Sequence, residues 1–309
     1  MIVAITGICS GLGRALVPKL QDDKLVEKII GIDIVDYEGN SEKIEFIKMD
    51  VRDAEIARAL KSVDILFHLA FIVIPKKFPK LKEIYEINVN GSKNVFQAAA
   101  QNEVKKIIYI SSQAVYGHVP ECPKIVRENA PRLGIKTKNL YYSHTKALVE
   151  KYLDKFEKTY PNISVIRFRP PVITGINFMP NLRIFSLVGK KRTIFPVKRK
   201  QRPSFQLIHE DDLTDALMLA VKKDIRGAFN VGGRILPDLR SFLKQRFDIS
   251  IIPIPNFLLH FLLPLGKIWP ILSWVQALKH SSLLNVEKAE KELGWKAKYS
   301  TAQCIEKLK

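Results

Sequence analysis

Cysteine is scarce in this chain of 309 residues. The three cysteines, Cys9, Cys122 and Cys304, lie far apart and form no C-x-x-C pair. Disulfide-stapled scaffolds and thiolate zinc sites need paired or closely spaced cysteines, so neither is expected. The chain begins with the apolar run 1–5, without a charged segment or cleavage site ahead of it. Secretion is therefore not expected, and a reducing cytoplasm is the expected location.

Acidic residues are also few: 31 Asp and Glu stand against 50 Lys and Arg, which gives a formal net charge of +19. Such an excess is typical of nucleic-acid-binding or membrane-surface proteins, and also of proteins with a lysine-rich surface. The basic residues are scattered, and the densest run, 189–192 with 198–202, is short. We therefore favour a lysine-rich surface, with this run as an exposed loop, over a nucleic-acid partner.

Long uninterrupted apolar runs are absent. Only residues 257–275 have the length of a membrane span, and they contain Pro264, Gly266, Lys267 and Pro270. A spanning helix needs about 20 predominantly apolar residues, so a proline-broken amphipathic helix that covers a pocket is favoured here over a membrane segment. The sequence contains no internal repeat and no low-complexity segment.

Short β-branched runs alternate with longer amphipathic stretches through the first half of the chain. This pattern is typical of a parallel sheet whose strands are joined by crossover helices. Strands are expected at residues 2–5, 28–32, 44–48, 65–69, 106–110, 164–167, 205–208 and 228–231, and helices at 12–20, 54–60, 82–102 and 142–160. We predict an α/β fold with a doubly wound parallel sheet. Its first domain covers 1–168, with the sheet completed by about 204–232, and an interleaved substrate-binding part covers 169–309.

A glycine-rich segment, Thr6–Gly13 (TGICSGLG), follows the first expected strand and begins a helix. Glycines in this position let the backbone approach a pyrophosphate, which the N–H groups at the helix start then bind. The second strand leads to Asp33, about 20 residues beyond the last glycine, where a carboxylate hydrogen-bonds the adenosine ribose of a dinucleotide. Asp33 would repel a 2′-phosphate, so NAD is favoured over NADP, although Arg14 could soften that preference.

Tyr142 and Lys146 form a Y-x-x-x-K pair at the start of the expected helix 142–160. A spacing of four places the phenol and the ammonium on one helix face, where the positive charge lowers the pKa of the phenol and favours proton transfer. Such pairs are common by chance. This one follows a strand that ends at Ser111 and Ser112, whose hydroxyls are expected at the carboxyl edge of the sheet, where ligands bind. We expect Ser112 and the pair to share one site.

Further motifs follow in order along almost the whole chain: Asp50–Asp53, His68–Ala70, Asn88–Gly91, Ser111–Gly117, Arg169–Pro170, Ile208–Asp212, Phe229–Gly232 and Leu293–Trp295. With the glycine segment and the Y-x-x-x-K pair, they resemble the extended branch of the short-chain dehydrogenase/reductase superfamily, the NAD-dependent epimerase/dehydratase family. The resemblance implies a Rossmann-type fold and NAD. It also implies hydride transfer between the nicotinamide and a secondary-alcohol carbon of a sugar or nucleotide sugar.

The resemblance assigns roles to the matching residues. Tyr142 is expected to act as the acid/base, Lys146 to bind the nicotinamide ribose and tune Tyr142, and Ser112 to orient the substrate. Ser112 is chosen over Ser111 because the family's hydroxyl precedes the Val-Tyr-Gly tyrosine by four positions. The expected cofactor-binding residues are Gly7, Ser10, Gly11, Leu12, Gly13, Asp33, Asp50, Val51, Leu69, Ala70, Asn88, Tyr142, Lys146 and Pro170. A homodimer that pairs the helices after Asn88 and Tyr142 is also implied.

Several positions depart from the family's pattern. The glycine spacing is TGxxxGxG where extended members show TGxxGxxG, and Phe71, Pro171 and Glu210 replace a small residue, a glycine and an apolar residue. Many nucleotide-sugar enzymes have an arginine four places before the histidine that corresponds to His209, and here that place holds Phe205. A hydroxysteroid- or small-ketone-type dehydrogenase is therefore the alternative. A non-catalytic NAD sensor or a nucleic-acid-binding relative is the second alternative.

His209, Asp211 and Asp212 lie close together in the sequence. Polar groups after a strand more often cap a helix than hold a metal, and we expect Asp211 or Asp212 to be the N-cap. His68 and His118 have no second histidine at metal-binding spacing and are interpreted as structural or pocket residues. We predict no metal site, a small-molecule substrate, and neither a nucleic-acid partner nor a membrane span.

Overall fold

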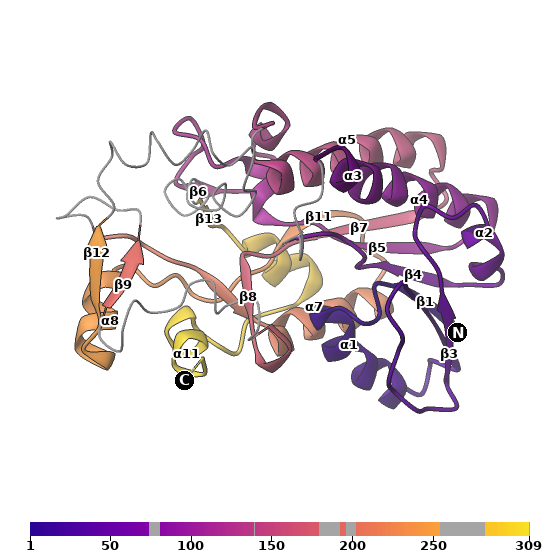
Figure 1. The fold of residues 1–309 in the computed structure, drawn as a ribbon, viewed down its shortest axis with the longest axis horizontal. Coiled ribbons are helices and arrows are strands. Elements are labelled where there is room, and N and C mark those ends of the chain that lie inside the picture. Colours follow the sequence, from indigo (N-terminus) through magenta and orange to yellow (C-terminus); the bar gives the residue numbers. More distant parts are fainter. Residues whose placement is uncertain (74–80, 139, 179–191, 196–201, 254–281, 309) are drawn as a thin grey trace.

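A parallel sheet of seven strands forms the centre of the computed structural model, which describes residues 1–73, 81–138, 140–178, 192–195, 202–253 and 282–308 (Figure 1). The strand order is β11–β7–β5–β4–β1–β2–β3, and every pairing is parallel. The strands are β1 (Ile2–Thr6), β2 (Lys28–Asp33), β3 (Ile44–Lys48), β4 (Ile65–His68), β5 (Lys106–Ile110), β7 (Ser164–Arg169) and β11 (Gly227–Asn230). The order reverses between β1 and β4, and open α/β sheets bind ligands beside that point, at the carboxyl ends of the strands.

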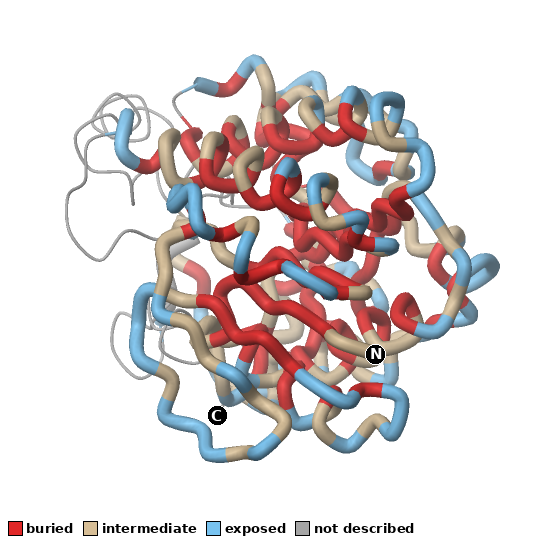
Figure 2. The backbone as a smooth tube through the Cα atoms, turned by 90° about the vertical axis from the view of Figure 1, so that its right-hand side faces the viewer, coloured by how far each residue is buried: buried red, intermediate tan, exposed pale blue. Residues whose placement is uncertain are grey.

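Helices cover both faces of the sheet, which confirms the predicted doubly wound α/β fold (Figure 1). Val3 and Ile5 face one hydrophobic cluster and Ala4 faces the other, because successive strand side chains point to opposite faces. The first cluster includes α1 (Gly11–Asp22) and α7 (Glu210–Lys222), and the second includes α2 (Ile56–Ala59), α4 (Ser92–Gln101) and α5 (Tyr141–Thr159). The buried residues accordingly concentrate in the strands and on the inner sides of the helices (Figure 2).

Outside the central sheet, the described residues form three short parallel pairs. They are β8 (Val172–Thr174) with β10 (Leu207–His209), β9 (Arg192–Phe195) with β12 (Ser250–Pro253), and β6 (Ile125–Val126) with β13 (Leu283–Leu284). The described part of the second half also contains helices α8 (Leu239–Phe247) and α11 (Thr301–Glu306). Of the two late strands expected at 205–208 and 228–231, only the second joins the central sheet, as β11, whereas β10 pairs with β8 outside it.

The helix expected over 82–102 is divided into α3 (Leu81–Tyr85), a π-helical turn (Glu86–Gly91) and α4. Gly91 ends the turn where the chain passes so close to Val51 that a Cβ at Gly91 would lie 2.6 Å from the Val51 Cγ2. A π turn inserts a residue into the helical ladder, and such turns are frequent at functional sites. Apolar periodicity predicts the extent of this helix but carries no signal for the inserted residue.

Two features of the sequence lie outside the described residues. These are the apolar stretch 257–275 and most of the basic run, of which Arg192 and Arg202 are described and are exposed. Within the described ranges, no helix has both the length and the apolar character needed to cross a membrane.

Candidate active site

The glycine segment forms a tight turn between β1 and α1. Gly7 has φ +78°, and a Cβ there would lie 2.6 Å from the backbone nitrogen of Ala70. A Cβ at Gly13 would lie 2.2 Å from the carbonyl oxygen of Ile8, so neither position tolerates a side chain. Ser10 is the N-cap of α1, and its hydroxyl accepts a hydrogen bond from the Gly13 N–H at 3.0 Å. The turn therefore brings bare backbone and the start of α1 to the carboxyl edge of the sheet, as a pyrophosphate requires.

Asp33, the last residue of β2, lies against this turn. One carboxylate oxygen accepts a hydrogen bond from the Cys9 N–H at 3.0 Å, and the other accepts from the N–H groups of Ile34 and Val35 at 2.8 and 3.2 Å. Burial and the Asp33 charge together raise the pKa of the Cys9 thiol to about 11, and the nearby Arg14 charge opposes this rise. Asp33 and Arg14, the two residues expected to set the choice between NAD and NADP, thus both lie near the same turn.

Replacing Asp33 by asparagine is expected to lower the ratio of the affinity for NAD to the affinity for NADP. A carboxylate facing a phosphate costs several kcal/mol, so we expect the wild type to bind NAD about 100-fold more tightly than NADP. Titration calorimetry with both dinucleotides measures the ratio. Asp36→Asn makes the same change of charge at a neighbouring exposed residue that pairs with Lys48, and should leave the ratio unchanged. A wild-type preference for NADP would mean that Arg14 dominates this pocket.

Asp50 and Val51 follow β3 at the same edge. The backbone N–H of Met49 donates to the Asp33 carbonyl at 2.9 Å, which brings the ends of β2 and β3 together. Arg52 donates to both carboxylate oxygens of Asp50, at 2.9 and 2.7 Å, and these bonds lower the pKa of Asp50. Val51 is buried in the core. The structure therefore places both residues at the edge where β2 ends, with the Asp50 carboxylate paired to Arg52.

Four further expected cofactor residues lie along this edge. Leu12 is buried in the first turn of α1, Leu69 is buried directly after β4, and Pro170 is buried directly after β7. A Cβ at Gly11 would lie 2.7 Å from the carbonyl oxygen of Asn177, so the segment after β8 closes over the start of α1. The strand ends thus bring residues distant in the sequence to one continuous edge.

Ser112 and Tyr142 meet at the end of β5. The Ser112 hydroxyl accepts a hydrogen bond from the Ala114 N–H at 3.2 Å, and Ser112 also forms a side-chain hydrogen bond with Tyr142. The neighbouring Ser111 hydroxyl instead donates to Glu150 at 2.5 Å. The structure therefore places Ser112, rather than Ser111, against the Tyr142 phenol.

Lys146 lies on α5, one turn beyond Tyr142 and almost fully buried. Its ammonium donates to the Ile110 carbonyl at 2.5 Å and lies 3.6 Å from the ring centroid of Phe71 and 4.6 Å from that of Tyr109. Burial lowers the pKa of Lys146 well below its ordinary value, and the negative charge of Glu150 opposes this shift. The Ile110 carbonyl and the two aromatic rings thus surround the ammonium one helical turn beyond the phenol.

The expected lowering of the Tyr142 pKa is wrong. Burial raises the pKa of Tyr142 to about 12, and the hydrogen bond with Ser112 only partly offsets the rise. Desolvation disfavours the charged phenolate and is the largest cause of the rise. Tyr142 and Lys146 thus have the expected helical spacing, but burial keeps the phenol protonated near neutral pH.

His68 has a structural position, as the sequence indicated. One ring nitrogen lies 2.7 Å from the Thr6 hydroxyl and the other 2.8 Å from the Ser92 hydroxyl, which in turn donates to the Asn88 carbonyl at 2.6 Å. Burial lowers the pKa of His68 to about 3, so the ring is neutral. This buried chain of hydrogen bonds ties β1 and β4 to the start of α4.

The Asn88 side chain hydrogen-bonds to the backbone of a neighbouring segment. Its side-chain oxygen accepts from the Ile72 N–H at 2.8 Å, and its NH₂ donates to the Ile72 carbonyl at 3.0 Å. The Tyr141 hydroxyl donates to the Val73 carbonyl at 2.6 Å. Asn88, one of the residues expected to bind the cofactor, thus fixes the segment that carries Phe71.

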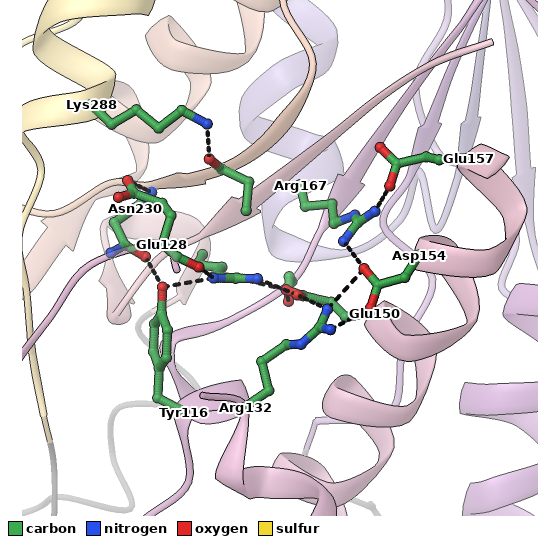
Figure 3. A network of polar contacts seen from close by, with 12 residues as sticks. Tyr116, Glu128, Arg132, Glu150, Asp154, Glu157, Arg167, Asn230 and Lys288 are labelled. Atoms are coloured by element: carbon green, nitrogen blue, oxygen red, sulfur yellow. Dashed lines mark hydrogen bonds and ion pairs between the residues drawn. The ribbon is translucent and has the colours of Figure 1, made fainter. Parts of the chain in front are cut away.

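A buried network of charges, which the sequence did not reveal, lies behind Ser111 (Figure 3). Glu150 is fully buried on α5, and Arg169 from the end of β7 pairs with both of its oxygens, with the Nε bond at 2.8 Å. Arg132 approaches the same carboxylate at 3.2 Å. Burial would raise the pKa of Glu150, but the charges and hydrogen bonds of the arginines outweigh it and hold the pKa at about 2.

The network extends to both sides of this pair (Figure 3). Asp154 accepts from Arg132 and Arg167, and Arg167 also pairs with Glu157. On the other side, Arg169 donates to the Tyr116 hydroxyl at 2.8 Å. Both residues of the central pair lie in or near motifs of the sequence, since Glu150 stands four residues after Lys146 and Arg169 begins the Arg-Pro motif. No local pattern, however, predicts that these two residues pair with each other.

The polar residues after β10 cap a helix, but the expected N-cap was wrong. His209 is the N-cap of α7 and accepts from the Asp211 N–H at 3.3 Å. Asp212 instead accepts from the N–H groups of Lys298 and Tyr299 at 2.9 and 3.0 Å, so its carboxylate holds the C-terminal segment. Among the described residues, no group of three or more His, Cys, Asp or Glu side chains is arranged to hold a metal ion.

The residues at this edge fit NAD. The glycine turn brings backbone free of side chains to the start of α1, the Asp33 carboxylate ends β2 beside it, and Tyr142 and Lys146 lie beyond β5 along the same edge. The family model for the NAD dependent epimerase/dehydratase family matches residues 3–232. The motifs of the glycine turn and of Tyr142 and Lys146 both fall within this match.

Relatives and solved structures agree with this match. The dTDP-D-glucose 4,6-dehydratase of Mus musculus is 23% identical over 332 aligned positions, which cover 99% of this chain and 86% of the mouse protein. The UDP-N-acetylglucosamine 4-epimerase of Methanobrevibacter ruminantium M1, solved with UDP-N-acetylmuramic acid, has a TM-score of 0.75 at 23% identity, covering 99% of this chain and 96% of that one. The UDP-glucuronic acid 4-epimerase of Bacillus cereus, solved with NAD, has a TM-score of 0.74 at 18% identity, with the same coverage.

The two solved structures show the same fold, and the family match spans most of the chain. Together with the glycine turn, these findings show that this chain belongs to the NAD dependent epimerase/dehydratase family, whose members are NAD-dependent enzymes of the extended short-chain dehydrogenase/reductase type.

Proposed function

We propose that this enzyme transfers a hydride between NAD and a secondary-alcohol carbon of a sugar or nucleotide sugar, as the first step of an epimerisation or dehydration. One observation carries the proposal. The Tyr142 phenol is hydrogen-bonded to Ser112, and Lys146 lies one helical turn further along α5. Together with the Asp33 carboxylate and the glycine turn, this cluster occupies one edge of the sheet.

Each side chain has a task that suits its position. When bound, NAD supplies or accepts the hydride. Tyr142 takes the proton of the substrate hydroxyl as the alcohol is oxidised and returns it on reduction. The Ser112 hydroxyl hydrogen-bonds the same substrate oxygen and orients it, and the Lys146 ammonium binds ribose hydroxyls and stabilises the phenolate by its charge.

The substrates named for the relatives support a nucleotide sugar as the substrate of this enzyme. The mouse relative is a dehydratase of dTDP-D-glucose, and the two solved structures are epimerases of UDP-sugars. Activity is tested by incubating the purified protein and NAD with a panel of UDP- and dTDP-sugars and identifying products by NMR. An epimer or a keto sugar is the expected product. A protein that binds NAD but converts no member of the panel would contradict the proposed substrate class.

A second candidate substrate is a less polar secondary alcohol, such as a hydroxysteroid or small ketone. Phe205 is the observation that favours it, because a phenylalanine stands where many nucleotide-sugar enzymes have an arginine. Phe205 pairs its backbone with Leu236 and packs against a small cluster formed by Leu239 and Ile251. Adding hydroxysteroids and small ketones to the panel separates the two candidates. Only the second candidate predicts NAD-dependent oxidation or reduction of a substrate that carries no nucleotide.

A further inference from the structure

Phe71 occupies the middle of the candidate site. Its ring centroid lies 3.6 Å from the Lys146 Nζ and 5.9 Å from the ring centroid of Tyr142, which it meets edge to face. The Ile110 carbonyl and the Tyr109 ring contact the same ammonium from other sides. An ammonium has three N–H donors and no acceptor, so each of these contacts takes a direction from which a ligand hydroxyl would otherwise approach.

The backbone around Phe71 is fixed on both sides. Before it, the backbone of Ala70 lies so close to Gly7 that a Cβ there would be 2.6 Å away. After it, Asn88 holds both backbone groups of Ile72, and Tyr141 holds the Val73 carbonyl. The position of the Phe71 backbone beside Lys146 therefore follows from the fold, and these contacts are made by the neighbouring residues and not by the ring.

We propose that Phe71 is a displaceable cap on Lys146, and that its ring occupies the face of the ammonium to which the ribose hydroxyls of NAD bind. The inference rests on the role proposed above for Lys146. A small residue at this position would remove the ring from that face of the ammonium. The binding of NAD therefore includes the loss of the contact between the ring and the cation. Phe71 lowers the affinity for the dinucleotide and makes the release of Lys146 depend on its arrival.

Displacement of the cap also prepares Tyr142. The ring is the edge-to-face partner of the phenol and lies against the ammonium that has to stabilise the phenolate. Once the ring has moved away, Lys146 and Tyr142 face the bound ligands and no longer share a hydrophobic partner. Phe71 is thus a positioning residue, which acts through Lys146 and does not itself take part in proton transfer.

Phe71→Leu and Phe71→Met keep an apolar side chain but remove the aromatic face, so both variants test the cap. We expect each to bind NAD about 10- to 30-fold more tightly than the wild type in titration calorimetry. That change corresponds to about 1.4 to 2 kcal/mol, the range of a desolvated cation–π contact. ADP carries the adenosine and the two phosphates but no nicotinamide ribose, so its affinity should stay the same. Unchanged or weaker NAD binding in both variants would overturn the proposal.

Lys146→Met separates failure of the cap from failure of the proposed function. If Lys146 binds the ribose, this variant binds NAD more weakly, and adding Phe71→Leu to it no longer changes the affinity, because the two residues act through one contact. NAD affinity that is unchanged in Lys146→Met would contradict the role of Lys146 and the cap together. Weaker binding in Lys146→Met, combined with no effect of Phe71→Leu in the wild-type background, would contradict the cap alone.

Discussion

Replacing Tyr142 by phenylalanine is expected to lower turnover of the substrate by a factor of about 10² to 10⁴, the usual contribution of a positioned general acid or base. The substitution removes one oxygen and leaves the ring that packs edge to face on Phe71. The glycine turn and Asp33 lie on other strands and are untouched. NAD should therefore bind with an affinity close to that of the wild type.

Steady-state product formation measures the loss of turnover, and titration calorimetry with NAD measures the cofactor affinity separately. Tyr152→Phe is the matched control, since it removes a phenol from the same helix at a place where the hydroxyl contacts only Gln97 among the described residues. That variant should keep wild-type activity. If Tyr142→Phe retains turnover within a factor of about ten, below the lower limit for a general acid or base, another group moves the proton.

Replacing Glu150 by glutamine is expected to lower the free energy of unfolding by about 3 to 5 kcal/mol, because removal of one partner from a buried ion pair leaves an uncompensated charge. Glu150 is fully buried and pairs with Arg169, which is itself almost fully buried. Arg132 and the Ser111 hydroxyl lose a charged partner as well. The lost ion pairs and hydrogen bonds lie where α5, β5 and β7 meet, directly behind the candidate site.

Urea denaturation of the wild type and the variant measures this difference. Glu55→Gln removes a carboxylate from an exposed pair with Arg58 and should change the stability by less than about 0.5 kcal/mol. The pKa of Glu150 is about 2 in the folded protein, below its ordinary value of 4.5, so its stabilising effect is complete above about pH 4.5. That effect is lost as the pH falls toward 2, and the two proteins should converge over this range. Equal urea midpoints at neutral pH would contradict the stabilising role of the network.

The sheet could be predicted from the sequence because its signals are local. The strands at 44–48 and 106–110 have the bounds that the apolar runs indicated, and the glycine segment forms the expected turn. Local signals were weaker at element ends. His209 caps α7 although aspartates, which are stronger capping residues, follow it, because Asp212 binds the backbone of residues 298 and 299 instead.

The arrangement of the site depends on contacts between distant parts of the chain, which no local pattern records. The motif spacing brought Tyr142, Lys146 and Ser112 together as expected, but their electrostatics depend on Phe71, which is 75 positions before Lys146. The ring position depends in turn on Asn88, whose amide reaches Ile72 from the π-helical turn. The sequence marked Phe71 as unusual for its position, but only the fold shows what the ring contacts.

Hydride transfer from the substrate carbon to NAD, with Tyr142 taking the hydroxyl proton, is the central claim, and a deuterated substrate tests it most directly. The enzyme with NAD is mixed with a substrate labelled at the reacting alcohol carbon, and the nicotinamide is recovered after a rapid quench and examined by mass spectrometry. We predict that the reduced nicotinamide carries the deuterium in the wild type, and that in Tyr142→Phe almost none is formed. Conversion of the substrate with the deuterium lost to solvent, and none on the nicotinamide, would contradict the account.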